Sequence, residues 1–456
     1  MNISGRGDLA LKVVAAATLV QDRVLHPRSK GSVEMRSDIS PTPPKLEMHR
    51  NFPQPPAKLT FSEALSLLGT RAAIAGRLVG GVARAVADTD RMGELWHRLQ
   101  DYDHYDRFRS ATAAPRKAFV GRTSESGPFS LLVTSNSGLY LLDNEGWHCL
   151  LRVICFGIAR HQDTLYIGAA AGLHSFIISA QIVGRDSIDA LRDVKVLARY
   201  ETRYQNERIH QIAYDPRANL IYGANCRRNS LIAVDPGGRG IVDEKFLFVD
   251  PSGSPFFTDQ NHVNAVTVNG DALLFAVRYA GAGSGLGFVA NNIVRVYLYP
   301  AVGVHDVVIH DGGIMFTDSF RERGTDQNHK VFGAVRFRGE EHLTQSIDAG
   351  SRNMVLRGLA MRGSTIAVGF SAFARREERV STAGGGIIAL RGDKSVGIID
   401  GPFGQVYDVL PVDGARTDAP GPARSVDELD FMFRRDVGPL LFEAPLVLDA
   451  KMGPLR

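Results

Sequence analysis

The chain has 456 residues, of which 44% are hydrophobic and 22% are charged, and its formal net charge is +4. A chain of this length can bury a large core, and this composition is typical of a globular protein rather than a disordered one. So small a net charge gives no reason to expect binding to nucleic acid or to an anionic membrane surface.

The three cysteines and the N-terminal apolar run bear on the cellular compartment. Cys149, Cys155 and Cys226 are an odd number without CxxC spacing, which argues against a disulfide framework and a zinc knuckle. The run VVAAATLV at 13–20 is too short to span a bilayer, and no small-residue cleavage site follows it. We therefore predict a cytoplasmic protein without a membrane span.

Two segments precede the main domain. Residues 1–58 are rich in Pro, Ser and Lys in their second half and lack sustained periodicity, which predicts a disordered or loosely ordered arm. Thr60 and Glu63 have capping-box spacing, and the apolar positions that follow fit one helical face. We predict a helical extension over 59–110, which caps the main domain, docks a protein partner or lies on a membrane surface.

From about Pro128 the pattern changes to short strands that recur as strand–turn–strand units. The apolar triplets 212–214, 266–268, 307–309 and 359–361 bring the units into register. Units in this register begin near Phe156, His210, Asn264, His305, Arg357 and Tyr407. Their spacing of roughly 40 to 55 residues is that of propeller repeats. The fold class predicted is all-β, a six-bladed β-propeller over 120–415 with an N-terminal α-helical extension.

The two ends of the propeller complement each other. The first hairpin, 130–143, has no inner strand of its own, and the last unit has one good strand, 405–411. Closed propellers often build one blade from both ends of the chain, which removes a free sheet edge. We therefore expect these two segments to share a blade, and the tail 416–456 to pack on the propeller.

Polar residues gather at equivalent positions of the innermost strands, which line the axis of a propeller. They are His210, His262, Asn264, His305, Arg357, Tyr407 and Asp408. Three interpretations remain open. The side chains bond one another and water, or they bind an anionic or polyhydroxylated small molecule, or the histidines hold a transition metal.

We assign roles within this cluster as follows. His262, His305 and Arg357 are the candidate catalytic residues, with a histidine as general base and Arg357 stabilising negative charge. The candidate substrate-binding residues are His210, Asn264, Tyr407 and Asp408. If a metal is present, its ligands are His210, His262 and His305, a set that suits zinc, iron or copper better than calcium.

The glycine-rich run at 281–287 superficially resembles a phosphate-binding loop. No helix follows it, and we interpret it as a flexible loop between strands.

Several of these motifs together resemble an uncharacterised family of bacterial six-bladed propeller proteins, a domain of unknown function. The shared elements are His262-Val263-Asn264, where the family has His-Leu-Asn, then His305 with Asp311-Gly312 and Asp318-Ser319, then Arg357-Gly358-Leu359-Ala360 with Val368-Gly369-Phe370-Ser371, and Val406-Tyr407-Asp408, where the family has Ile-Tyr-Asp. The chain departs from the family at Asp306-Val307-Val308, where the family carries Ser-Pro-Arg, and at Ile209, where it carries an aspartate. The resemblance implies the fold and no settled activity.

The sequence thus predicts that the axial cluster binds a small polar or anionic metabolite, in a protein that is an enzyme of a biosynthetic pathway or a binding protein. A non-catalytic interaction scaffold that uses the N-terminal helices is the first alternative. A lactonase-like, metal-dependent hydrolase is the second, although an axis rich in histidine differs from the oxygen ligands of such enzymes.

Overall fold

The computed structural model describes most of the chain after residue 104. The described residues are 105–113, 115–123, 129–171, 174–184, 188–201, 209–226, 228–248, 261–280, 283–300, 303–323, 330–338, 340–341, 354–372, 384–391, 394–416 and 422–448. The predicted arm and most of the predicted helical extension lie outside them. Residues 105–113 are helical, and Phe108 stacks on Phe176 with ring centroids 4.2 Å apart.

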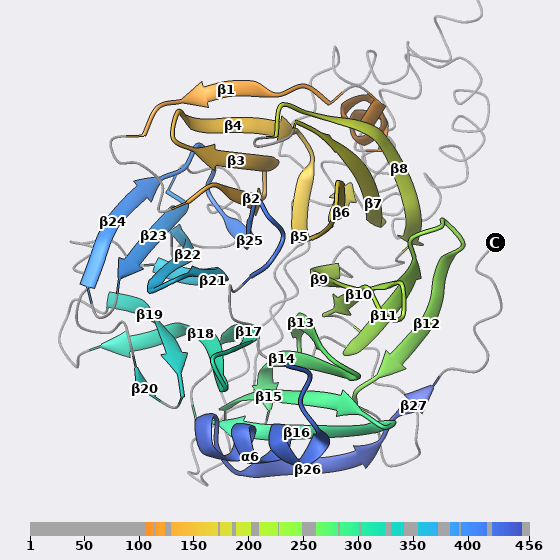
Figure 1. The fold of residues 1–456 in the computed structure, drawn as a ribbon, viewed down its shortest axis with the longest axis vertical. Coiled ribbons are helices and arrows are strands. Elements are labelled where there is room, and N and C mark those ends of the chain that lie inside the picture. The colour runs from red at the N-terminus through yellow and green to blue at the C-terminus, as the bar shows by residue number, and fades with distance from the viewer. Residues whose placement is uncertain are drawn as a thin grey trace, which may run out of the picture. The chain divides into compact units, whose positions relative to one another are not determined.

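The described strands form six antiparallel sheets arranged as a six-bladed β-propeller (Figure 1). We number the blades by the chain order of their innermost strands. Blade 1 contains β5 (Ile154–His161), β6 (Thr164–Ala171), β7 (His174–Val183) and β8 (Ala190–Glu201). Blade 2 contains β9 (Ile209–Asp215), β10 (Leu220–Asn225), β11 (Ser230–Asp235) and β12 (Gly240–Phe246). Blade 3 contains β13 (Val263–Asn269), β14 (Ala272–Ala280), β15 (Gly283–Ala290) and β16 (Ile293–Tyr299).

The remaining blades follow the same order from the innermost strand outward. Blade 4 contains β17 (Val304–His310), β18 (Gly313–Arg323), β19 (Lys330–Phe337) and β20 (Glu340–Glu341). Blade 5 contains β21 (Met354–Arg362), β22 (Thr365–Ala372), β23 (Gly386–Arg391) and β24 (Lys394–Asp400). Blade 6 contains β25 (Val406–Pro411), β2 (Leu131–Ser135), β3 (Leu139–Asp143), β4 (Gly146–Leu151) and β1 (Ala118–Gly121).

Blade 6 joins the two ends of the propeller. β25 is its innermost strand and pairs antiparallel with β2, from Leu131 opposite Pro411 to Ser135 opposite Val406. The early hairpin β2–β3 therefore obtains its inner strand from a segment more than 260 residues later. This pairing closes the ring and removes the free inner edge of β2.

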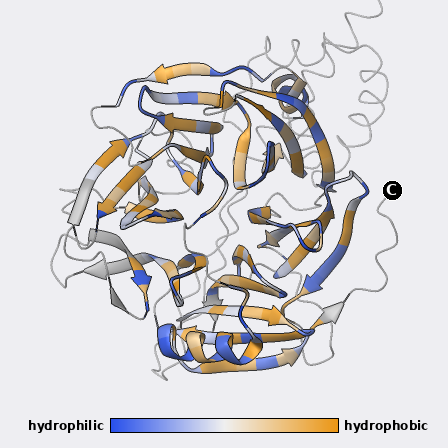
Figure 2. Cartoon of the chain, viewed as in Figure 1, coloured by the Kyte–Doolittle hydropathy of each residue, from blue (hydrophilic) through white to orange (hydrophobic). Residues whose placement is uncertain are grey.

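The core is divided among the blade interfaces. Each of six clusters of buried apolar side chains combines residues of two neighbouring blades, as in the cluster of Met315 from blade 4 with Leu356 and Val368 from blade 5. Hydrophobic residues accordingly run along strands of all the sheets (Figure 2). Both faces of a blade are covered, which explains why β6 and β15 are almost continuously buried instead of alternating.

The C-terminal segment covers the outside of blades 2 and 3. β26 (Leu440–Pro445) pairs with β16, and β27 (Val447–Leu448) pairs with β12. Helix α6 (Val426–Asp436) begins at a capping box of Ser425 and Glu428 and stacks Phe433 on Tyr297. Exposed strand edges that would invite aggregation are thereby paired.

One prediction about the loops is wrong. Residues 281–287 were expected to be a flexible loop, but β15 begins at Gly283 and pairs with β14 and β16. A Cβ at Gly287 would lie 2.0 Å from the carbonyl oxygen of Arg295. These glycines therefore serve close packing between strands. No helix in the described part of the chain is long and apolar enough to cross a membrane.

Candidate functional site

The innermost strand of every blade carries one extra residue relative to its neighbour, at the same point of the repeat to within one residue. In blade 4, His305 pairs with Thr317 and Val307 pairs with Phe316, so Asp306 has no partner residue. The corresponding register shifts occur in β5, β9, β13, β21 and β25. A bulge of this kind bends the strand and redirects side chains, and bulges are common beside active sites.

Side chains at and beside the bulges form two separate groups, which we describe as two layers. We call the first the histidine layer, formed by Phe156, His210, His262, Asn264, Arg278, His305, Arg357 and Tyr407. We call the second the carboxylate layer, formed by Gln211, Asp306, Asp408 and Arg416. In three blades, two neighbours in sequence divide between these layers. They are His210 and Gln211, His305 and Asp306, and Tyr407 and Asp408.

One side of the histidine layer is aromatic. The rings of Tyr407 and Phe156 have centroids 4.4 Å apart, those of Phe156 and His210 5.7 Å, and those of His210 and His262 5.1 Å. Phe156 is buried, whereas His210, His262 and Tyr407 are partly exposed. Solvent therefore reaches this layer, as a binding site requires.

The other side of the layer is basic. The guanidinium carbon of Arg357 lies 5.7 Å from the ring centroid of Tyr407. Arg357, Arg278 and His262 all lie close enough to His305 to act on its charge. Ring contacts thus lead from Tyr407 through Phe156 and His210 to His262, and the charges of His262 and Arg357 both act on His305. The structure brings together five of the residues predicted from the sequence, namely His210, His262, His305, Arg357 and Tyr407, and it holds Asn264 against Val304, the residue before His305.

His305 is held in one tautomer. Its Nδ1 lies 3.0 Å from the carbonyl oxygen of Gly303 and 2.8 Å from Oγ of Ser319. A carbonyl oxygen can only accept, and Ser319 donates its own hydrogen to the carbonyl of Leu356 at 2.5 Å. The ring hydrogen is therefore on Nδ1, and Nε2 carries the lone pair.

The surroundings of His305 also keep the imidazole neutral. The side chain is buried, and burial disfavours the charged form. Burial first, and then the charges of Arg357 and Arg278, hold the pKa of His305 well below its usual range. The result is a neutral acceptor beside two permanent positive charges.

Asn264 offers a second acceptor. Its Nδ2 donates to the carbonyl oxygen of Val304 at 2.8 Å, which settles the orientation of the amide. Its Oδ1 is buried and has no hydrogen-bond partner among the described residues. Such an atom in a native protein calls for water or a ligand as its partner.

Arg278 was missed by the sequence analysis because it does not stand on an innermost strand. It lies on β14, one residue beyond Val277, which pairs with Val263. Its backbone N–H donates to the carbonyl oxygen of His262 at 3.2 Å. The signal was present in the hairpin, since extending the β13–β14 pairing by one residue places Arg278 beside His262.

The backbone directly before β13 is unusual at His262. Its φ is +55°, a conformation that residues other than glycine rarely adopt. The amide of His262 donates to Oδ1 of Asn229 at 3.1 Å, and the amide of Asn261 donates to the same atom. A buried asparagine thus holds the left-handed turn that leads His262 into the layer.

The carboxylate layer is internally satisfied. Arg416 donates through both terminal nitrogens to Asp408, at 2.7 and 2.6 Å, and Nε2 of Gln211 bridges Asp306 at 3.0 Å and Asp408 at 3.3 Å. Asp306 also accepts from Thr317 and from the amide of Gly358. Burial first, and then the charge of Asp408, raise the pKa of Asp306 to about 6.

This layer changes the interpretation of Asp408. The sequence placed it with the substrate-binding residues, but its side chain is fully buried and accepts from Arg416, Gln211 and the amides of Ile158 and Val409. The bulge at Tyr407 separates the two neighbours, so Tyr407 lies in the histidine layer and Asp408 does not. Asp408 therefore joins blades 1, 2 and 6.

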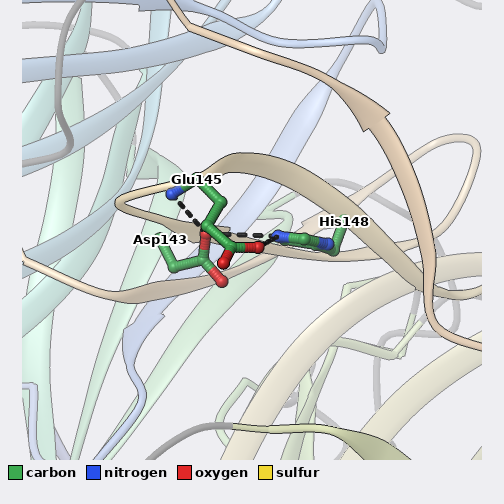
Figure 3. A group of neighbouring side chains, drawn as sticks. All are labelled: Asp143, Glu145 and His148. Carbon is green, nitrogen blue, oxygen red and sulfur yellow. Dashed lines mark hydrogen bonds and ion pairs between the residues drawn. The ribbon is translucent and has the colours of Figure 1, made fainter.

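The metal hypothesis for the three histidines does not correspond to a preformed site. Among the described residues, one group has its candidate ligand atoms within 4.8 Å of one another, and it is Asp143, Glu145 and His148 (Figure 3). His210, His262 and His305 are not brought to that spacing. Asp143 accepts the amides of Glu145 and Gly146 and lies 3.2 Å from Nε2 of His148, as a tight β3–β4 turn requires.

No family model matches the chain, and no curated protein sequence matches it. Solved structures similar to it include a nidogen–laminin complex, at 9% identity and a TM-score of 0.39, over 61% of this chain and 97% of that one. The hydrazine synthase of Kuenenia stuttgartiensis is similar at 14% identity and a TM-score of 0.35, over 72% of this chain and 90% of that one. The periplasmic gluconolactonase of Pseudomonas aeruginosa is similar at 12% identity and a TM-score of 0.34, over 70% of this chain and 98% of that one. Each of these TM-scores is below 0.5 and each identity is below 15%, so the similarities say nothing of the activity of this chain.

Proposed function

We propose that the histidine layer binds a small anionic metabolite. The observation that carries this proposal is the placement of Arg357 and Arg278 beside a buried, neutral His305, at one register of the propeller repeat. Two guanidinium groups in a partly buried site concentrate positive charge, and a bound anion offsets that charge.

The difference between the layers also supports a binding role. In the carboxylate layer, Arg416 neutralises Asp408 through a bidentate ion pair. The histidine layer includes partly exposed His210, His262 and Tyr407 and the buried acceptor Oδ1 of Asn264. Ligand sites of proteins combine apolar walls with a few convergent polar groups in this way.

Thermal unfolding tests the proposal. Purified protein is melted with phosphate, sulfate and a panel of carboxylates at constant ionic strength, and mass spectrometry identifies any small molecule that copurifies with it. A specific anion raises the melting temperature of the wild type and of Arg239→Gln, whose side chain is exposed and paired with Asp235. Arg357→Gln loses that increase. If every anion acts equally on the wild type and on Arg357→Gln, the proposal fails.

Catalysis at this site is a second candidate, favoured by the orientation of His305. Its Nδ1–H is directed to Gly303 and Ser319, so Nε2 is the basic atom, and Arg357 is close enough to stabilise negative charge as it develops. Incubation with a metabolite extract, followed by mass spectrometry, tests this role. The wild type and Arg239→Gln consume a metabolite that His305→Gln and His262→Ala leave unchanged. Equal consumption by all four proteins contradicts it.

A further inference from the structure

The β3–β4 turn of blade 6 brings three metal-ligating side chains to one place. Asp143 ends β3, Glu145 lies in the turn, and His148 lies on β4. Their candidate ligand atoms lie within 4.8 Å of one another, and the side chains point toward one another (Figure 3). None of the three belongs to the histidine layer, so this site stands or fails independently of the proposed function.

His148 is fixed by the packing of blade 6. The residue is 5% exposed, and it pairs with Phe119 of β1, whose ring contacts the imidazole at a centroid distance of 5.4 Å. Its Nε2 lies 3.2 Å from Oδ1 of Asp143 and 3.8 Å from Oε2 of Glu145. An imidazole that is already held in place loses little conformational freedom when it binds a cation.

Asp143 is fixed by the turn itself. Its Oδ1 accepts the amides of Glu145 at 2.9 Å and Gly146 at 3.3 Å. All of its hydrogen bonds within the described part of the chain use Oδ1, so Oδ2 retains its lone pairs. The side chain of Glu145 is 79% exposed and is free to adjust. Two ligands are therefore held by the fold, and the third can close on an ion.

The spacing and the charge of the group both suit a metal. Two ligands of a tetrahedral zinc ion lie about 3.4 Å apart, because each is about 2.1 Å from the ion. The distances of 3.2 and 3.8 Å from Nε2 of His148 are close to that value. No described lysine or arginine pairs with Asp143 or Glu145, and a divalent cation would offset the repulsion of their two carboxylates.

We propose that Asp143, Glu145 and His148 bind a divalent transition metal of the zinc class, with water as the fourth ligand. One imidazole nitrogen and carboxylate oxygens suit zinc, whereas calcium requires more ligands, all of them oxygen. The bound ion ties the β3–β4 turn to β4 in the blade that closes the ring. The competing arrangement is an ion pair between a protonated His148 and the two carboxylates, which needs no metal.

Calorimetric titration of the full-length protein, first treated with a chelator, distinguishes the two. Zinc is added near neutral pH to the wild type, Asp143→Asn, Glu145→Gln and Asp215→Asn. Asp143→Asn keeps an oxygen that accepts the turn amides but loses the anionic oxygen. Asp215 is the matched control, because its Oδ1 accepts the amides of Arg217 at 2.9 Å and Ala218 at 3.3 Å and it belongs to no described metal-ligating group.

We expect the wild type and Asp215→Asn to bind one equivalent of zinc whose affinity falls about tenfold or more in Asp143→Asn and in Glu145→Gln. Calcium should bind the wild type more weakly than zinc does. Zinc binding should also weaken near pH 5, because a protonated imidazole cannot be a metal ligand.

Two results would overturn the proposal. If the wild type binds no zinc, or if all four proteins bind zinc with the same stoichiometry and affinity, the three side chains form an ion pair only. If calcium binds the wild type as tightly as zinc does, His148 is not a ligand and the assigned metal class is wrong.

Discussion

The histidine layer and the carboxylate layer arise from the same bulges, one residue apart, yet they differ in how their charges are satisfied. Asp408 and Arg416 form a buried bidentate pair, and Gln211 and Thr317 complete the bonding of Asp306. In the histidine layer, Arg357 and Arg278 lie beside a neutral imidazole, and a buried amide oxygen has no described partner. A buried charge that is paired within the protein has its desolvation offset, whereas a partly exposed layer that holds a buried acceptor without a described partner is suited to a ligand.

The largest expected effect breaks the carboxylate layer. Arg416→Met leaves Asp408 buried without its cation, and the free energy of unfolding should fall by about 3–5 kcal/mol, as for other buried pairs that lose one partner. Arg239→Met, which removes the exposed partner of Asp235, should change it by less than about 1 kcal/mol. Urea denaturation measures both. Equal losses would show that the buried pair has no special structural role.

A smaller effect should follow from filling the space at a bulge. In Gly358→Ala the backbone is strained at φ +78°, and the new Cβ lies 2.6 Å from the backbone nitrogen of Val409 in blade 6. Gly363→Ala is the matched control on the same hairpin. Its φ is +55°, and the added Cβ would meet none of the counted heavy atoms within 4 Å. We expect a loss of about 3 kcal/mol at Gly358 and about 1 kcal/mol at Gly363, again by urea denaturation. Similar losses of unfolding free energy at both positions would mean that the close contact between blades 5 and 6 at Gly358 does not contribute to the effect.

The two layers should respond to pH with opposite signs. The pKa of Asp306 is raised to about 6 in the folded protein, above its ordinary value of 3.8, so the folded state binds the proton more tightly than the unfolded state. Its contribution is fully present below pH 3.8 and is lost as pH rises to about 6, by up to about 3 kcal/mol. Asp306→Asn should flatten this part of the curve of unfolding free energy against pH. An unchanged slope in the variant would contradict the assignment.

The response of His305 runs the other way. Its pKa in the folded protein lies well below the ordinary 6.5, so its contribution is present above pH 6.5 and is lost as pH falls below that value. His305→Gln should remove this loss on the acid side while leaving the Asp306 slope unchanged. Unfolding free energies from pH 4 to pH 8 compare the variant with the wild type. A loss on acidification that persists in His305→Gln would assign the effect to another group.

Much of the architecture followed from local pattern. Alternation and turn residues predicted the strands, and the aligned triplets predicted six units with Phe156, His210, Asn264, His305, Arg357 and Tyr407 at one register. Each of these residues lies at a bulge of its innermost strand or, as His305 does, directly before one. The motif Asp318-Ser319 also has a physical role, because Ser319 orients His305 and Asp318 accepts from Tyr299.

The sequence by itself determined the strands, the sixfold repeat and the residues that reach the axis, because these depend on spacing along the chain. Only the tertiary structure decided which side of a bulge each side chain takes, and it thereby separated Asp408 from Tyr407. It also revealed the roles of Arg278 and Arg416 and fixed the tautomer of His305. These features depend on contacts between blades, and no period in the sequence encodes the distance between side chains that meet across the axis.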